Sequence, residues 1–451
     1  MRKLFHQQPT LINCPVAHEH GRELEVISDL LDGMPEVLIS VQQDLVGRCK
    51  SPATGREGLN AEQVLRALIV KQMNGFSFEM LAFHLQDSLC YRRFCKVGMM
   101  DEGPSKSALQ RAIKLLKPET LELCNHAILA RARSEKVEEG LKVRIDCTVM
   151  ETDIHHPTDS TLLEDGVRVL CRTMRKAKQH FGIRAVDRRR RAKRRSLQIK
   201  NATKDKDRQG WYRDLLGITR EVLEEAERVA GELATVRAVT VEAMALSIGL
   251  AQTIEHYIPL LAKVIEQTKH RVFEGEKVAA KDKIVSLFEP HTDIIVKKRR
   301  ETCYGHKVVL AGGASGLVTD LIVLDGNPAD STLALTMLER HQQFYGRPPR
   351  QAAFDGGFAS KQNLAEAKAL KINDVAFSKK RGLTVEAMVK STWVYKRLAN
   401  FRAGIEGMIS FLKRCIGFDR CNFQGKQSFA SYAWASVLTA NLLLLARRLL
   451  L

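Results

Sequence analysis

The spacing of apolar residues divides the chain into helical and strand-like stretches. From residue 59 to 135, apolar positions recur every three to four residues, which is the period of an amphipathic helix. Asn60 and Gln63 have the form of a capping box, so one helix is predicted to begin there and to end before the first glycine that follows. The same spacing predicts two more helices, at 77–91 and 105–116.

A strand pattern begins at Lys142 and runs to Met150. Apolar and polar side chains alternate along it with a period of two, which is typical of a half-buried strand. Asp146 lies in the middle of this stretch on its more polar face, where aspartate is uncommon. A second apolar run, 350–354, ends at Asp355 and a pair of glycines. A carboxylate that follows a strand and precedes a glycine turn lies where α/β sheets place their active sites.

A third carboxylate, Glu406, lies on a helix predicted over 400–413. One stripe of this helix is apolar at helical spacing, and its members are Ile405, Met408, Ile409, Leu412 and Ile416. Arg402 and Lys413 share a second row with Glu406. A carboxylate flanked by two cations on one helix face can hold a metal while the cations contact phosphate.

The remaining pattern predicts how these elements are ordered. Two strands around a glycine-rich turn, 302–310 and 317–324, predict a hairpin. Helices are predicted at 331–344 and 360–370, and a short strand at 374–378. The order is β-β-β-α-β-α-β-α, interrupted after the first strand by a long helical stretch. We therefore expect a mixed α/β fold with a mixed five-stranded sheet flanked by helices, a helical insertion and an N-terminal helical module.

The domain limits that we expect follow from these changes of pattern. They are a helical arm and linker at 1–58, a helix-turn-helix-like module at 59–135, a core at 140–166 and 280–430, a basic helical insertion at 167–279, and a C-terminal helix at 431–451. The last helix has an apolar stretch that is shorter than the ~20 residues of a membrane span. We expect it to pack on the core.

The net charge adds a candidate partner to this picture. Basic residues outnumber acidic ones by 71 to 52, and the formal net charge is +19. Much of the excess lies within 172–208, which contains Arg188, Arg189, Arg190, Arg191, Lys193, Arg194 and Arg195. Phosphate is the natural partner of such a run, because neutralising phosphate releases counterions. We expect contact with nucleic acid, and disorder without it because like charges repel; a solvated charged face is the alternative.

The third helix of the N-terminal module offers a second surface for DNA. Its outer face carries Lys106, Gln110, Arg111 and Lys114, whereas its other face is apolar. This arrangement is typical of a helix-turn-helix module in which the third helix reads DNA. The alternative is a plain helical bundle used for dimerisation.

The ten cysteines and the N-terminal residues indicate the cellular compartment in which the protein is expected to reside. The cysteines are scattered without the paired spacing of a zinc site or a disulfide framework. In a chain of 451 residues they are typical of reduced thiols in a cytosolic protein. The first residues include no apolar run like that of a signal peptide.

Several of these motifs, in this order along the chain, resemble one family of enzymes. Asp146, Asp355 and Glu406 look like the acidic triad of DDE transposases, whose catalytic core is RNase H-like. Arg402, Glu406 and Lys413 match the Arg-x3-Glu-x6-Lys part of the signature helix of one large insertion-sequence group, with Ala399 in place of that signature's tyrosine. The stretches that look specifically like the ISNCY type are 149–163, 291–293, 304–307 and 353–358.

The resemblance implies a transposase that binds the terminal inverted repeats of its insertion sequence and catalyses metal-dependent DNA cleavage and strand transfer. Asp146, Asp355 and Glu406 would be catalytic and would hold two Mg²⁺ ions per active site, with Mn²⁺ able to replace them. Arg402 and Lys413 would contact DNA. The implied partners are double-stranded DNA of the element ends and the target, and a second copy of the chain on that DNA. The implied location is the cytoplasm of a bacterium, on the nucleoid, without a membrane.

Two other functions stay open from the sequence. A catalytically idle DNA-binding regulator would need the basic segment and the helical module but not the acidic triad. An RNase H-like nuclease without transposition would need the triad but no specific recognition of DNA ends.

Overall fold

The chain folds into two compact units. The computed structural model describes residues 18–47, 58–98, 100–237, 240–296 and 301–450. The first unit combines Met1–Glu151 with His306–Leu451, and the second is Thr152–Gly305. The first unit contains two apolar cores, and the second unit contains one of its own.

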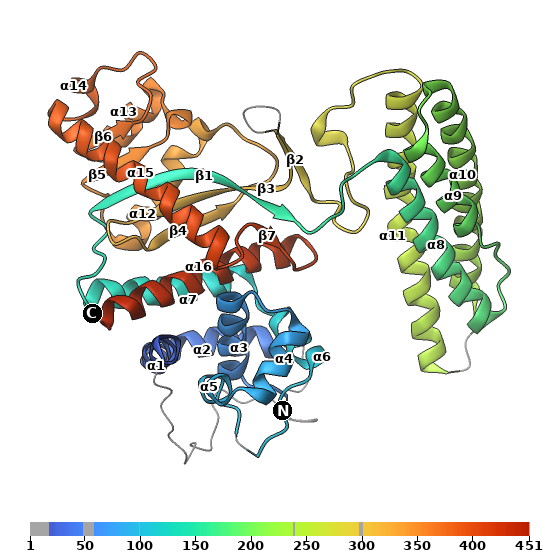
Figure 1. Ribbon diagram of the computed structural model, residues 1–451, viewed down its shortest axis with the longest axis horizontal. Helices are drawn as coiled ribbons and strands as arrows, with labels where there is room; N and C mark the ends of the chain where they lie inside the picture. Colours follow the sequence, from blue (N-terminus) through green and yellow to red (C-terminus); the bar gives the residue numbers. More distant parts are fainter. Residues whose placement is uncertain (1–17, 48–57, 99, 238–239, 297–300, 451) are drawn as a thin grey trace. The chain divides into compact units, whose positions relative to one another are not determined.

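The first unit contains an N-terminal group of helices, a sheet with its covering helices, and a long C-terminal helix (Figure 1). Its helices are α1 (Glu19–Asp32), α2 (Pro35–Val46), α3 (Ala61–Asn74), α4 (Phe78–Asp87), α5 (Leu89–Phe94), α6 (Lys106–Ile113), α7 (Pro118–Ser134), α12 (Ala334–Tyr345), α13 (Lys361–Ala369), α14 (Val385–Met388), α15 (Thr392–Cys415) and α16 (Lys426–Leu449), with short 3₁₀ turns at η3 (Asp330–Thr332) and η4 (Gly356–Phe358). Its strands are β1 (Lys142–Thr152), β3 (Thr302–Gly312), β4 (Val318–Val323), β5 (Gln351–Phe354), β6 (Asp374–Phe377) and β7 (Arg420–Cys421), of which β1 and β3 reach into the second unit.

The sheet is mixed, as the alternating strand and helix patterns predicted. β3, β1, β5 and β6 follow one another across it, with β4 on β3 and β7 on β1. β1, β5 and β6 are parallel, whereas β3 and β4 form the predicted antiparallel hairpin. The expected fold class, a mixed sheet flanked by helices as in RNase H-like cores, is confirmed. The sheet has seven strands rather than five, because β2 (Asp293–Val296) pairs with the first residues of β3 and the two-residue β7 pairs with β1.

The two faces of the sheet pack into two different apolar cores. Along β3, Val308 and Leu310 belong to a core shared with the N-terminal helices, α16 and the second half of α15. Val309 and Ala311, one residue out of step, belong to a core shared with α12, α13 and the first half of α15. Successive strand residues point to opposite faces of the sheet. Because each face packs into one of the two cores, both faces are buried, and few strand positions are left for polar side chains.

The N-terminal helices follow the predicted pattern with one break. Asn60 and Gln63 form the expected capping box of α3. The helix predicted at 77–91 is instead two helices, α4 and α5, which is a correction to the sequence-based expectation. Ser88 separates them because its backbone is extended and its hydroxyl accepts a hydrogen bond from Tyr91 N–H, so that it caps α5.

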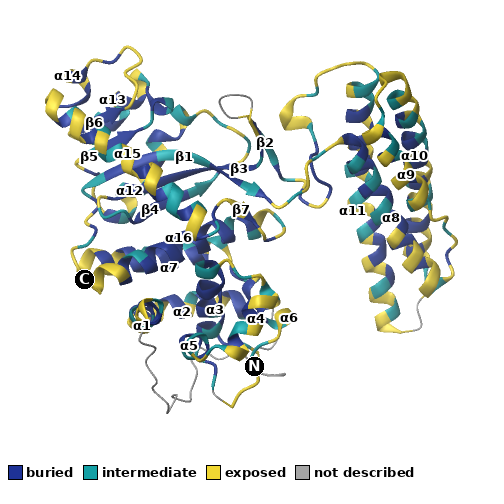
Figure 2. Ribbon diagram, in the orientation of Figure 1, coloured by how far each residue is buried: buried dark blue, intermediate teal, exposed yellow. Residues whose placement is uncertain are grey.

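The C-terminal helix α16 packs on the core, as expected. It lies against α7, α3 and β4, and it is dark blue along most of its length in Figure 2. Its length and composition would allow it to cross a membrane, but 89% of its most apolar stretch is buried inside the protein. The Asn441 amide donates to Asn125 Oδ1 and to the carbonyl of Val318, so this buried polar side chain of α16 is satisfied by its neighbours.

The second unit is a bundle of long helices and also includes β2, which pairs with residues 302–305 of β3 (Figure 1). Its elements are α8 (Asp159–Phe181), α9 (Arg189–Asn201), α10 (Asp205–Thr235), α11 (Val241–Val272), the 3₁₀ turn η1 (Ala280–Asp282) and β2. The unit begins before the insertion expected at 167–279, since Thr158 caps α8 and helix starts at Asp159. At Gly166 a Cβ atom would lie 2.3 Å from Leu261 Cδ1, so α8 and α11 pack more closely than a side chain would permit.

Candidate active site

Three carboxylates from three different parts of the first unit lie around the side chain of Arg402. β1 and β5 run parallel in a register that pairs Ile145 with Phe354. Asp146 follows Ile145 within β1, and Asp355 directly follows the last residue of β5, so the register places them side by side. Glu406 comes from α15, which packs against β5 and β6. Parallel pairing therefore brings together carboxylates that are far apart in the sequence.

Arg402 connects all three carboxylates. Its Nη2 lies 3.0 Å from Asp146 Oδ2 and 3.0 Å from Asp355 Oδ1, and its Nη1 lies 3.0 Å from Glu406 Oε1. Arg402 and Glu406 are one helical turn apart, which puts them in the same row of α15 as predicted. The guanidinium group provides the positive charge that three neighbouring carboxylates require.

The environment shifts the pKa values of the two aspartates in opposite directions. Burial raises the pKa of Asp146, although the Cys147 N–H, which donates to Oδ1 at 2.8 Å, and the Arg402 charge both work against it. Burial also acts to raise the pKa of Asp355, but the Gly356 N–H, the Ser378 hydroxyl and Arg402 outweigh it and lower that pKa. Asp355 is therefore the more firmly ionised of the two.

Lys413 holds the far end of α15 against β1. Its ammonium group donates to the carbonyl of Val149 at 2.8 Å and lies 3.3 Å from Asp419 Oδ1. Arg402 and Lys413 of the predicted row therefore contact β1, whereas Glu406 contacts Arg402 and its side chain is largely exposed. Contact of Arg402 and Lys413 with DNA stays a prediction.

Arg144 is a residue of this site that the sequence reasoning missed. It precedes Asp146 by two residues and so shares its face of β1, which was the available signal. Its side chain is 8% exposed, donates to the carbonyl of Phe401 at 3.1 Å and lies over the Phe401 ring at 4.9 Å. Gly404 leaves room for it, because a Cβ atom there would be 2.2 Å from Arg144 Nη1. Arg144 thus locates α15 on the sheet.

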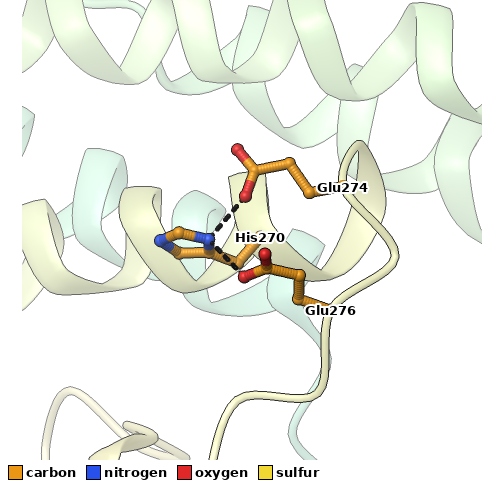
Figure 3. A group of neighbouring side chains, drawn as sticks. All are labelled: His270, Glu274 and Glu276. Atoms are coloured by element: carbon orange, nitrogen blue, oxygen red, sulfur yellow. Dashed lines mark hydrogen bonds and ion pairs between the residues drawn. The ribbon is translucent and has the colours of Figure 1, made fainter.

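The donor set of this site suits a hard divalent cation, since carboxylate oxygens are the ligands that Mg²⁺ prefers. Among the described residues, the only three ligand atoms within 4.8 Å of one another lie elsewhere, on His270, Glu274 and Glu276 (Figure 3). There both carboxylates contact the same His270 Nδ1, and both glutamates are exposed. The three carboxylates around Arg402 are spaced more widely than that, with the guanidinium between them.

The predicted DNA-reading face of α6 is exposed. Leu109, Ala112 and Ile113 are buried in the N-terminal core, as expected of the inner face. Lys106, Arg111 and Lys114 are exposed, and Gln110 is partly exposed. Lys106 lies 3.0 Å from Glu79, and the Arg111 side chain donates to the carbonyl of Ser107. Binding of DNA by these four residues stays a prediction.

The basic run is ordered in the second unit, so the expectation of disorder without DNA is wrong. The run forms α9, which packs on α8 and α10. Acidic side chains neutralise part of it: Arg188 pairs with Glu221 and Glu225, Arg189 with Asp187, and Arg191 and Arg195 with Asp214. The sequence reasoning counted the charges of the run but not the acids that α10 places opposite them. Arg190, Lys193 and Arg194 are exposed.

Two parts of the chain match models of known families. Residues 16–115 match the family described as Transposase domain (DUF772), and residues 287–442 match the Transposase DDE domain. The second match contains Asp355, Arg402 and Glu406, whereas Asp146 and almost all of the second unit lie outside both. No curated protein and no solved structure matches the chain. The two matches, on a mixed sheet that carries three converging carboxylates, support an insertion-sequence transposase of the DDE kind.

Proposed function

We propose that this protein is a transposase of the ISNCY kind that binds the terminal inverted repeats of its insertion sequence and catalyses DNA cleavage and strand transfer. The observation that carries the proposal is the convergence of Asp146, Asp355 and Glu406 on one guanidinium group. Each carboxylate comes from a different element: Asp146 lies within β1, Asp355 directly follows the neighbouring parallel strand β5, and Glu406 lies on α15. The matched transposase domains support the same reaction class.

The three carboxylates are the proposed ligands of two Mg²⁺ ions, which Mn²⁺ can replace. When bound, such ions activate the attacking hydroxyl and stabilise the leaving oxygen of the phosphodiester. Asp355 offers an ionised carboxylate held in place by Gly356 N–H and Ser378. Arg402 is within reach of all three ligands, and its release from them leaves a cation free to contact the DNA phosphate. Lys413 and Arg144 keep α15, and with it Glu406, in position on β1.

Recognition of DNA is assigned to two surfaces. The exposed face of α6, with Lys106, Gln110, Arg111 and Lys114, is proposed to read the element ends. The exposed cations of α9 are proposed to contact the backbone without regard to sequence. We further propose that the protein acts as a homodimer on the two element ends, in the bacterial cytoplasm at the nucleoid.

The test is a cleavage and joining assay with duplexes that carry the inverted repeats flanking the gene. Asp146→Asn, Asp355→Asn and Glu406→Gln keep the shape of each side chain but remove its charge. We expect each to abolish Mg²⁺- and Mn²⁺-dependent cleavage while DNA binding persists. Glu386→Gln, an exposed residue of α14, is the matched control and should retain activity.

The outcomes separate the three candidate functions. Wild-type protein that binds the repeats but neither cuts nor joins them would indicate an idle regulator. Cleavage of any duplex without joining would indicate an RNase H-like nuclease. Full activity in any one of the three amide variants would remove that residue from the proposed metal site.

A further inference from the structure

The cations of the basic run fall into two structural groups. Arg188, Arg191 and Arg195 point to α10, where Glu221, Glu225 and Asp214 pair with them. The Arg195 guanidinium also lies 4.7 Å from the centroid of the Trp211 ring. These three arginines attach α9 to α10 and are not free to bind another anion. The number of positive charges in the run is therefore larger than the number available to bind an anionic ligand.

The second group lines a cavity between α8 and α9. The cavity has a volume of about 630 Å³. Arg168 and Arg172 of α8 and Arg189, Arg190 and Lys193 of α9 line it, together with two acids, Glu164 and Asp187.

The cavity keeps an excess of positive charge after its internal pairs are formed. Asp187 is fully engaged by Arg189, and the Arg168 guanidinium pairs with Asp165. Within the described part of the chain, the side chains of Arg172 and Arg190 make no hydrogen bond or ion pair, and both residues are exposed. Burial raises the pKa of Glu164, although the nearby charges of Arg168 and Lys193 act against it, and among the described residues no ion pair joins Lys193 to Glu164.

The lining has five cations and two acids, and cations in excess of the acids on one cavity repel one another, so the arrangement favours an anionic ligand. The lining excludes an apolar ligand, because guanidinium groups would have to be desolvated without a partner. It also excludes a metal cation, which the arginines would repel. Arginine in particular offers forked donors that match phosphate oxygens.

We propose that the cavity between α8 and α9 binds a backbone phosphate of duplex DNA. This proposal rests on the proposed function, because it assumes that the protein acts on DNA. A polymer is favoured over a free phosphate ion by the position of Arg190, Lys193 and Arg194. They lie three and four residues apart, form one exposed row on α9 and extend the positive surface beyond the cavity. In this proposal the DNA affinity of the second unit is concentrated in Arg172 of α8 and in Arg190 and Lys193 of α9.

The test compares two triple variants of the full-length protein that lose the same charge. The cavity variant is Arg172→Gln, Arg190→Gln and Lys193→Gln. The control variant is Lys176→Gln, Lys178→Gln and Lys200→Gln, whose lysines are exposed on α8 and α9 but do not line the cavity. The affinity for a random-sequence duplex is measured at several salt concentrations, and thermal unfolding shows whether each variant is folded.

We expect the cavity variant to bind the duplex more weakly and to flatten the plot of log affinity against log salt, by about one unit for each DNA phosphate that the variant no longer binds. The control variant should keep a slope closer to that of the wild type. Equal slopes in the two variants would overturn the proposal. So would a result in which inorganic phosphate stabilises the wild type but not the cavity variant while the two DNA slopes agree, because the cavity would then hold free phosphate.

Failure of this proposal can be told apart from failure of the proposed function. If only the cavity assignment is wrong, wild-type protein still cleaves the element ends and the triad variants do not. If the function itself is wrong, wild-type protein does not both cut and join the element ends, whatever the cavity variant does.

Discussion

At the scale of single residues, Arg402 supplies the positive charge beside the three carboxylates of the acidic site. One guanidinium group contacts three carboxylates, each at 3.0 Å. Asp146 is largely buried, so its charge has little water to stabilise it. Without Arg402 the three negative charges would repel one another, and a bound cation would be the remaining way to neutralise them.

We predict that Arg402→Gln lowers the stability of the metal-free protein by about 1–2 kcal/mol, since it removes charge-assisted hydrogen bonds that are only partly exposed. Mg²⁺ should then raise the melting temperature of the variant more than that of the wild type, because ligand binding stabilises the folded state. Thermal unfolding with and without Mg²⁺ measures both effects. Arg414→Gln, an exposed arginine of the same helix, is the control. An equal Mg²⁺ shift in variant and wild type would contradict the role given to Arg402.

Lys71 is a second residue at which burial of a charge costs free energy of folding. Its side chain is 1% exposed, and its ammonium group has Asn422 Oδ1 at 3.3 Å. The rings of Phe78, Phe423 and Tyr432 surround it at 5.1 to 5.9 Å. The rings attract the cation, but burial dominates and lowers the pKa of Lys71 to about 8.

The lowered pKa predicts a pH-dependent difference between wild type and Lys71→Met. Below pH 8 the lysine is charged in both the folded and unfolded states, so the folded state bears the full burial penalty. Between pH 8 and 10.5 the folded state loses the proton first, and the penalty disappears as the pH rises. The variant should be more stable than the wild type by about 1–3 kcal/mol at pH 7, and the gap should narrow above pH 8. Urea unfolding across this range tests it, with exposed Lys114→Met as control; a gap independent of pH would refute it.

At the scale of elements, the contact between α15 and β1 depends on a glycine, which has no side chain to block the approach of Arg144. Arg144 passes beside Gly404, where a Cβ atom would lie 2.2 Å from Nη1. Gly407, one turn further along α15, has nothing within 4 Å of the corresponding position. These two glycines of one helix therefore make a matched pair.

We predict that Gly404→Ala destabilises the protein by about 1–3 kcal/mol, because overpacking displaces Arg144 or α15. Cleavage should also fall, since Glu406 moves with the helix. Gly407→Ala should instead stabilise the protein by roughly 0.5–1 kcal/mol through its helix propensity. Denaturant unfolding and the cleavage assay measure both variants. If the two substitutions had the same effect on stability, the close packing at Gly404 would be disproved.

The predictions of helices and strands were confirmed where residues close in sequence determine the element, and some helix boundaries were wrong. The capping box at Asn60, the strand around Asp146 and the hairpin of β3 and β4 all follow from residues close in sequence. The break at Ser88 was missed because serine is tolerated inside a helix and only its extended backbone marks the boundary. α15 begins at Thr392 rather than at residue 400, because Ser391 caps it there.

At the scale of the whole molecule, the second unit has a core of its own. Its buried residues come from all four helices, including Leu250, Ile254 and Leu261 of α11. The unit is also continuous in sequence, from Thr152 to Gly305. A continuous segment with its own core is expected to fold alone.

We predict that a fragment of residues 152–305 is helical by circular dichroism, unfolds cooperatively on heating and retains salt-dependent binding to duplex DNA. A fragment of residues 152–235 lacks α11 and should not fold cooperatively, because the apolar faces of α8 and α10 would be exposed. A disordered longer fragment would show that the unit depends on the rest of the chain.

The sequence by itself determined the type of most elements, the mixed fold class and the identity of the three carboxylates. These follow from period-two and helical spacing, from caps and glycine turns, and from the rarity of aspartate inside a strand. All of them are properties of residues within a few positions of one another, which is why they can be read without a structure.

Only the tertiary structure decided how distant residues meet. The parallel register of β1 and β5 places Asp146 beside Asp355, and the packing of α15 places Arg402 between them and Glu406. The same holds for the basic run, where α10 supplies the acids that neutralise Arg188, Arg191 and Arg195. Charges of opposite sign attract according to their distance in space, and neither periodicity nor composition encodes that distance.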